Sequence, residues 1–76
     1  MPKLPRVKPT QVIRALKRAG FFIDHTTGSH YILYKDDKSN PVTVAIHNKN
    51  LKIGTLKSIL KQAKLSVEDL KKYLKK

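Results

Sequence analysis

The chain has 76 residues and no cysteine, and its 17 Lys and Arg residues against 5 Asp and Glu residues give a formal net charge of +12. A chain of this length forms one small domain, which excludes a large enzyme with an enclosed substrate cavity. The lack of cysteine excludes disulfides and thiolate zinc sites. No segment approaches the about 20 apolar residues of a membrane-spanning helix or the apolar stretch of a secretory signal. We therefore expect residues 1–76 to form a single domain of a soluble, cytoplasmic protein.

The positive charge is concentrated at both ends of the sequence. Residues 1–20 carry six basic and no acidic side chains, residues 21–50 carry three of each, and residues 51–76 carry eight basic and two acidic. A net charge of +12 exceeds the magnitude of about 2 to 8 that serves solubility in a small domain. We interpret the excess as a surface for a polyanion, with nucleic acid first. A membrane surface is disfavoured because no apolar face remains once the core is assigned.

The first third of the chain predicts an arm followed by a helix. Residues 1–9 contain three prolines and three basic side chains, which favours an extended basic arm. Thr10 is a suitable N-cap, and apolar residues recur along one face of residues 11–19, which predicts a helix. Gly20 is expected to end it.

The middle of the chain predicts three strands joined by short turns. Residues 21–23 are rich in strand-forming side chains, and residues 26–28 are typical of a turn. Residues 31–34 predict a second strand, turn-forming residues gather in 36–41, and residues 42–46 alternate as a third strand. Consecutive strands with short connections predict an antiparallel meander.

Two further helices are predicted after the strands. Gly54 and Thr55 introduce the first, in which apolar residues recur at helical spacing through Ala63. Ser66 and Asp69 form a variant of the capping box before a short last helix. Its expected inward-facing residues are Val67, Leu70, Tyr73 and Leu74. The sequence therefore predicts an α+β fold, α-β-β-β-α-α, with the two main helices on one face of a three-stranded antiparallel sheet and the other face open.

His30 is the strongest candidate for chemistry. It follows Gly28 and Ser29 where a hairpin opens, so we expect an exposed imidazole. Imidazole exchanges protons near physiological pH, which suits a general acid or base. On RNA, such a group would take the proton of the 2′-hydroxyl, nearby lysines would offset the charge on the phosphoryl oxygens, and no metal is required. The alternative is a turn histidine with no task, which composition alone favours.

The other two histidines receive weaker assignments. His47 is predicted at the end of the third strand on the open face, like Ala45. An antiparallel hairpin brings the start of one strand beside the end of the next, so His30 and His47 could form an acid–base pair. We expect His25 to be structural or solvent-facing. A metal site of the three histidines matches no ligand spacing with a known mechanism, so we expect no metal and no cofactor.

The predicted start of the second helix is a candidate phosphate site. The first turn of a helix presents free N–H groups and partial positive charge, so the amides around Gly54 and Thr55 could hold a phosphate. An ordinary helix start is an equally good interpretation.

Several motifs, in this order, resemble the HicA toxin family, also called YcfA-like. They are Leu4-Pro5, Leu16-Lys17-Arg18-Ala19-Gly20-Phe21, Gly28-Ser29-His30, His47, Gly54-Thr55-Leu56-Lys57-Ser58-Ile59-Leu60 and Leu65-Ser66. The resemblance extends from Leu4 to about Leu74. Its most specific element is Gly-Ser-His followed later by Gly-Thr-Leu.

The resemblance implies a fold like that of double-stranded RNA-binding domains. It also implies a toxin of a type II toxin–antitoxin system, a ribosome-independent mRNA interferase that acts on RNA. A cognate HicB-type antitoxin would cover the active centre, so the free toxin is expected to be a monomer and the complex a hetero-oligomer. The family's catalytic histidine corresponds to His30.

The expected roles of the remaining residues follow from these assignments. Gly28 and Ser29 would shape the turn that presents His30, and Lys52 and Lys57 would contact phosphate. A second basic surface, for RNA or for the antitoxin, would consist of Arg14, Lys17 and Arg18.

Two positions depart from the family's pattern. Ala45 stands where the family commonly has proline, two residues before the second histidine. Ala63-Lys64 stands where it commonly has Ala-Gly. Because Lys64 lacks glycine's ease in the left-handed region, we expect the second and third helices to join differently from the family's pattern.

Two other functions are compatible with the sequence. A noncatalytic double-stranded RNA-binding module would share the fold and the charge, and RNA cleavage distinguishes it. A DNA-binding or structural interaction protein is the third possibility. Competition between RNA and duplex DNA at about 0.15 M salt distinguishes that one, because nonspecific charge attraction dominates at lower salt.

Overall fold

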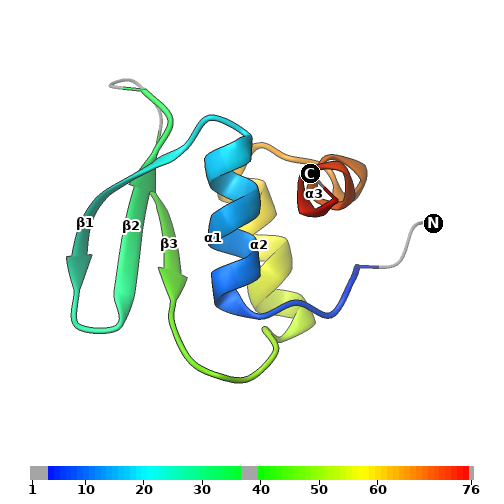
Figure 1. Ribbon diagram of the computed structural model, residues 1–76, viewed down its shortest axis with the longest axis horizontal. Coiled ribbons are helices and arrows are strands. Elements are labelled where there is room, and N and C mark those ends of the chain that lie inside the picture. Colours follow the sequence, from blue (N-terminus) through cyan, green and yellow to red (C-terminus); the bar gives the residue numbers. More distant parts are fainter. Residues whose placement is uncertain (1–3, 37–39, 76) are drawn as a thin grey trace.

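The computed structural model describes residues 4–36 and 40–75. In chain order the elements are α1 (Pro9–Arg18), β1 (Phe22–Thr27), β2 (His30–Tyr34), β3 (Val42–Ala45), α2 (Ile53–Ala63) and α3 (Val67–Leu74). The strands form an antiparallel sheet in the order β1-β2-β3 (Figure 1). The predicted α+β fold and its element order are confirmed. Residues 1–3 of the predicted arm and residues 37–39 of the predicted 36–41 turn lie outside the described part of the chain.

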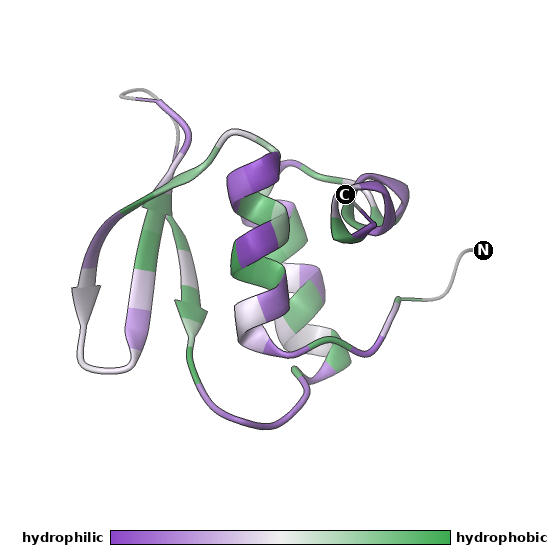
Figure 2. Cartoon of the chain, in the orientation of Figure 1, coloured by the Kyte–Doolittle hydropathy of each residue, from purple (hydrophilic) through white to green (hydrophobic). Residues whose placement is uncertain are grey.

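The two main helices, α1 and α2, both lie on the β3 side of the sheet. Both contact β3, whereas β1 is the strand farthest from them (Figure 1). α3 contacts α1 and lies beyond the helix pair, away from the sheet. Figure 2 shows apolar residues interspersed with polar ones along α1, α2 and β3, and each of these elements contributes buried apolar side chains to one core cluster. The largest side chains with almost no exposed surface are Pro9, Val12, Leu16, Leu33, Val42, Val44, Leu56 and Leu70.

The chain before α1 packs against the body of the protein. Val7 is buried, and its carbonyl oxygen accepts a 2.8 Å hydrogen bond from the N–H of Leu51. Leu4 is partly buried against the same core. The predicted extended arm over residues 1–9 is therefore too long at its C-terminal end, because Pro9 already belongs to α1.

The N-cap of α1 is Lys8, so the predicted N-cap at Thr10 is wrong. Proline is favoured at the first helical position, where its missing N–H would have no intrahelical partner, and Pro9 takes that position. The side-chain oxygen of Gln11 accepts a 2.7 Å hydrogen bond from the N–H of Lys8, which satisfies a polar group at the helix start. At the other end, Gly20 has φ +105° just beyond the C-cap, as predicted.

β1 is longer than the sequence predicts. Thr26 and Thr27, which were assigned to a turn, are its last two residues and pair with β2. The turn consists of Gly28 and Ser29 alone. A β-bulge interrupts the pairing between Ile23 and His25, so Asp24 is an extra residue on β1.

The N-cap of α2 is Lys52, and Gly54 and Thr55 are its second and third residues rather than its start. Lys64 at the C-cap has φ 58° and ψ 39°, the left-handed conformation that glycine commonly provides. Lysine thus adopts the glycine-like conformation here, so the reason for expecting a different helix junction does not hold.

The predicted capping box of α3 is confirmed. The N–H of Asp69 donates to the hydroxyl of Ser66, and the N–H of Ser66 donates to the Asp69 carboxylate, both at 3.0 Å. Leu70 is fully buried, as predicted for the inner face of α3. The other three predicted residues of that face, Val67, Tyr73 and Leu74, are partly buried against the core.

Candidate functional site

His30 is the first residue of β2 and is exposed. It pairs with Thr27 across the two-residue turn of Gly28 and Ser29. Gly28 has φ +58° at the first central position, which is typical of a type II′ hairpin turn. The carbonyl oxygen of Ser29 accepts a 2.7 Å hydrogen bond from the N–H of Ile46. The turn before His30 is therefore fixed to the chain that leaves β3.

The side chain of His30 belongs to the sheet face that points away from the helices. Leu33 pairs with Val42, and both are buried on the helix face. Alternation along β2 then puts His30 and its partner Ala45 on the opposite face. His25, which pairs with Ile32, shares that face one row farther along the sheet.

A hollow of about 380 Å³ begins beside this row of residues, between the end of β3 and the start of α2. Figure 1 shows that the β1–β2 turn, the end of β3 and the start of α2 lie at the same end of the molecule. Ala45 belongs to both sites, because it pairs with His30 and lines the hollow. The lining residues are Ala45, His47, Lys49, Asn50, Leu51, Lys52 and Thr55.

The hollow has the properties of an anion-binding site. Lys49 and Lys52 contribute positive charge, and no acidic side chain of the described residues lines it. The first helical N–H of α2 with an i−4 acceptor is that of Leu56, which donates to Lys52 at 2.9 Å, and α2 has no side-chain N-cap bond. The amides of residues 53–55 therefore lack an intrahelical acceptor and point toward the N-terminal end of α2.

His47 lies in the connection after β3, because the strand ends at Ala45 and not at residue 46. It is exposed and lines the hollow, but the direct partner of His30 in the sheet is Ala45. The Nδ1 atom of His47 accepts a 3.1 Å hydrogen bond from the N–H of Lys49. A ring that accepts at Nδ1 carries its proton on Nε2, so Nε2–H is the group that His47 can offer to a ligand.

The other predicted residues do not line this hollow. Lys57 is exposed farther along α2, and Arg14 and Lys17 are exposed on α1. Arg18 is exposed too, but its Nη1 atom donates to the carbonyl oxygen of Tyr73 at 2.7 Å, which binds α1 to the end of α3.

His25 is solvent-facing, as expected. Its Nδ1 atom lies 2.8 Å from Oδ2 of Asp24, and about half of each side chain is exposed. This pair belongs to the bulge of β1 and not to the hollow.

Sequence reasoning missed Lys49 and Asn50. Both line the hollow because the chain turns back from β3 toward α2 there. The signal in the sequence is a run of polar residues, His47 to Asn50, between a strand and a helix. Such a run predicts a loop, but not which of its side chains converge.

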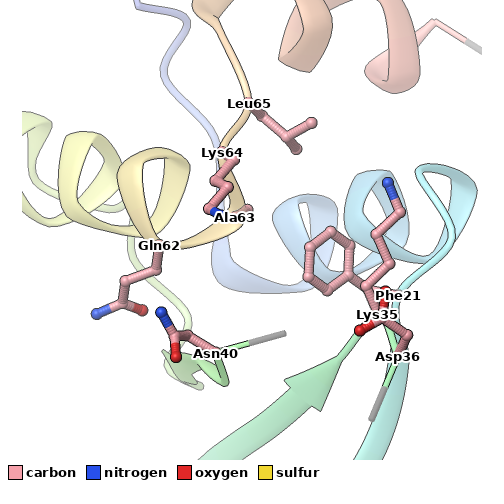
Figure 3. A pocket seen from close by; sticks show the side chains of 8 residues that line it. All are labelled: Phe21, Lys35, Asp36, Asn40, Gln62, Ala63, Lys64 and Leu65. Carbon is pink, nitrogen blue, oxygen red and sulfur yellow. The ribbon is translucent and has the colours of Figure 1, made fainter. Parts of the chain in front are cut away.

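A second hollow, of about 320 Å³, lies at the other end of the sheet (Figure 3). Its lining residues are Phe21, Lys35, Asp36, Asn40, Gln62, Ala63, Lys64 and Leu65. The side-chain oxygen of Gln62 accepts a 3.4 Å hydrogen bond from the N–H of Thr43 and thereby joins α2 to β3. No histidine lines this hollow.

The described residues contain no group of three or more His, Cys, Asp or Glu side chains that could hold a metal ion. In the same part of the chain, no helix has the length and apolar character needed to cross a membrane.

One comparison with known proteins gives a match. The sequence model of a family described as the HicA toxin of bacterial toxin–antitoxin systems matches residues 10–65. No curated protein matches the chain. The matched segment contains the sheet, α1 except for Pro9, α2, the Gly28–Ser29 turn and the hollow, whereas α3 lies beyond it.

Proposed function

Because the chain belongs to the HicA toxin family of bacterial toxin–antitoxin systems, we propose that it is an endoribonuclease in which His30 is the general base. One observation carries the proposal. His30 is exposed and directly follows a hairpin turn that is hydrogen-bonded to the chain after β3. Its cross-strand partner Ala45 lines a hollow that contains two lysines and no acidic side chain of the described residues. An acid–base group beside an anion site is the combination that cleavage of a phosphodiester needs.

The proposed reaction uses the RNA's own 2′-hydroxyl as the nucleophile. His30 takes the proton from that hydroxyl, and the oxygen attacks the adjacent phosphorus. The bond from phosphorus to the 5′-oxygen breaks, and the leaving oxygen takes a proton from water. The resulting hydroxide accepts the proton that His30 had taken, which restores the neutral imidazole. The products are a 2′,3′-cyclic phosphate and a 5′-hydroxyl, so the step requires no metal ion.

The hollow would hold the phosphate during this reaction. Lys49 and Lys52 supply charge, the free amides at the start of α2 supply hydrogen bonds, and His47 offers its Nε2–H to a phosphoryl oxygen. In this arrangement His47 stabilises charge, because its Nδ1 is occupied by the N–H of Lys49 and Nε2 carries the ring's proton. His30 thus acts as the base, whereas His47 acts as a hydrogen-bond donor to the phosphate.

We propose a HicB-type antitoxin as the protein partner. An antitoxin with acidic side chains would seek the same cations as RNA does, so it would inhibit by covering the hollow and His30. The second basic surface on α1, with Arg14 and Lys17 exposed, offers a further contact for either partner.

The test is cleavage of single-stranded RNA by the purified protein in the presence of a chelator. His30→Ala should reduce the rate by about 10²- to 10⁴-fold, the usual contribution of a general base, while RNA affinity and its salt dependence stay unchanged. His25→Ala is the matched control, because His25 is exposed on the same sheet face and outside the hollow. Equal rates for His30→Ala and the parent protein would exclude His30 as the base.

The same assay tests the second candidate function, a noncatalytic double-stranded RNA-binding module. The exposed cations of α1 and Lys57 lie outside the hollow and favour this alternative, because shape-based binding of a duplex uses widely spaced phosphate contacts. Tight binding of duplex RNA without cleavage of any RNA would support the module and contradict the nuclease.

A further inference from the structure

The open face of the sheet carries an aromatic pair, of which Phe22 is exposed and Tyr34 is partly buried. Phe22 of β1 and Tyr34 of β2 are direct cross-strand partners. Phe22 is 47% exposed, and among the described residues only it and Ile53 are large apolar side chains exposed to this degree. About half of the surface of Phe22 stays in contact with water, and Phe22 is not part of the buried core, so the core does not account for this exposed half.

This aromatic pair shares its sheet face with His30. Leu33, the neighbour of Tyr34, is buried toward the helices, so Tyr34 points the other way. Because side chains alternate along β2, Tyr34, Ile32 and His30 lie on the same face of the sheet. At about 3.3 Å per residue, the two ends of this row are roughly 13 Å apart. A single strand of RNA that crosses the face along β2 would therefore meet both sites.

A shallow hollow of about 200 Å³ adjoins the rings and is lined by Phe22, Asp24, Tyr34 and Asp36. The β-bulge brings Asp24 to this side of β1. Its Oδ2 atom interacts with Nδ1 of His25 at 2.8 Å. A carboxylate has about four acceptor sites, so one such interaction leaves capacity for more. No basic side chain of the described residues lines the hollow, which makes it unsuitable for phosphate.

Resting on the proposed function for its RNA ligand, we infer that Phe22 and Tyr34 stack an unpaired nucleobase and that Asp24 accepts a hydrogen bond from its amino group. Bases of single-stranded RNA stack on aromatic side chains exposed on sheet faces. Carboxylates accept from exocyclic amino groups such as N4 of cytosine. The site therefore selects bases that carry an amino group over uracil, whose carbonyl oxygens repel a carboxylate.

Stacking is tested by fluorescence anisotropy with labelled hexamers of adenylate, cytidylate and uridylate on the His30→Ala protein. Phe22→Leu keeps an apolar side chain and removes the flat ring, so the adenylate affinity should fall about 5- to 150-fold, the range for one stacked base. Phe22→Tyr should retain it. The salt dependence should be unchanged, because no charge is lost. Thr26→Ala is the matched control, an exposed position whose partner Tyr31 is packed against the core on the helix face.

Base selection is tested by the ratio of affinities rather than by any single affinity. The His30→Ala protein should bind the adenylate and cytidylate hexamers several-fold more tightly than the uridylate hexamer. Adding Asp24→Ala should abolish that preference, even though removal of a negative charge strengthens binding of every RNA. Adding His25→Ala, which removes the imidazole that contacts Asp24, should leave the preference intact.

The outcomes separate the two proposals. If the adenylate affinity is unchanged in both Phe22→Leu and Tyr34→Leu, the stacking site is overturned. The exposed ring of Phe22 would then serve contact with a protein instead. Undiminished cleavage by His30→Ala, together with a loss of affinity in Phe22→Leu, overturns the proposed base and supports the stacking site. Circular dichroism spectra test whether each variant is folded. If Phe22→Leu is not folded, the result for Tyr34→Leu decides.

Discussion

His30 and Ala45 face each other as the last pair of the β2–β3 ladder. Since the side chain of alanine is a single methyl group, little separates the row that holds His30 from the hollow that Ala45 lines. A substrate phosphate in that hollow would lie beside an exposed imidazole. This relationship depends on the register of two strands, and it connects residues 15 positions apart in the sequence.

Lys52 should contribute more to RNA binding than Lys57. Lys52 lines the hollow at the start of α2, whereas Lys57 is exposed farther along the helix and does not line it. For a single strand, each lost phosphate contact lowers the slope of log affinity against log salt by about 0.7. Lys52→Ala should show this change and Lys57→Ala should not, in binding titrations between about 0.05 and 0.2 M salt. Equal slopes for the two variants would contradict the assignment of the hollow.

Substitution by alanine should lower the free energy of unfolding at Gly28 and raise it at Gly54. An added Cβ at either position meets no atom within 4 Å, so backbone conformation decides the result. Gly28 has φ +58°, where alanine costs about 1 to 2 kcal/mol. Gly54 is helical, where alanine is more favourable than glycine by up to about 1 kcal/mol. Urea denaturation measures both free energies of unfolding, and only Gly28→Ala should also slow RNA cleavage, because its turn presents His30.

Lys64→Gly should stabilise the protein by about 1 kcal/mol. Lys64 has φ 58° at the C-cap of α2, a conformation that is unfavourable for every residue with a Cβ. Lys61→Gly is the control, because Lys61 lies in the last helical turn and glycine there should cost up to about 1 kcal/mol. Both variants remove one lysine, so their difference in unfolding free energy isolates the backbone effect. A destabilised Lys64→Gly protein would show that the lysine side chain stabilises the junction.

The α3 capping box should make stability depend on acidic pH. The hydrogen bond from the backbone N–H of Ser66, aided by the Ser66 side chain, holds the pKa of Asp69 below its ordinary value of 3.8. A carboxyl group whose pKa is lower in the folded state stabilises the fold above the ordinary value. That contribution is lost as the pH falls below 3.8 through the lowered pKa.

Asp69→Asn removes the titrating group and is the variant that tests this pH dependence. Its thermal midpoint should lie below that of the parent protein at pH 6, and the difference should shrink as the pH approaches 2. A constant difference across this range would mean that the charge of Asp69 does not contribute.

The order and type of the elements could be predicted from the sequence because local signals agree with the packing. Apolar residues at helical spacing in α1 and α2 are the buried ones, and Ser66 and Asp69 cap α3 as expected. The ends of elements were less predictable. Pro9 competes with Thr10 as a start signal, and Thr26 and Thr27 suit a strand as well as a turn.

The candidate site was predictable in part: the Gly-Ser-His motif indicates His30, and Lys52, one of the two lysines expected to contact phosphate, lines the hollow. Lys49 could not be assigned, because its approach to the hollow depends on the path of the chain between β3 and α2. The aromatic pair depends on register, and the position of Asp24 depends on a β-bulge that the alternation of residue types does not reveal.

The hydrogen bond from the N–H of Leu51 to the carbonyl oxygen of Val7 joins the start of the chain to the loop that carries Lys49. Val7 and Leu51 are both buried in the core, so the segment before α1 packs against the loop at Leu51. A shortened form that begins at α1 would keep every residue of the hollow and lose the support beneath it. Such a form would bind anions more weakly even though no binding group had been removed.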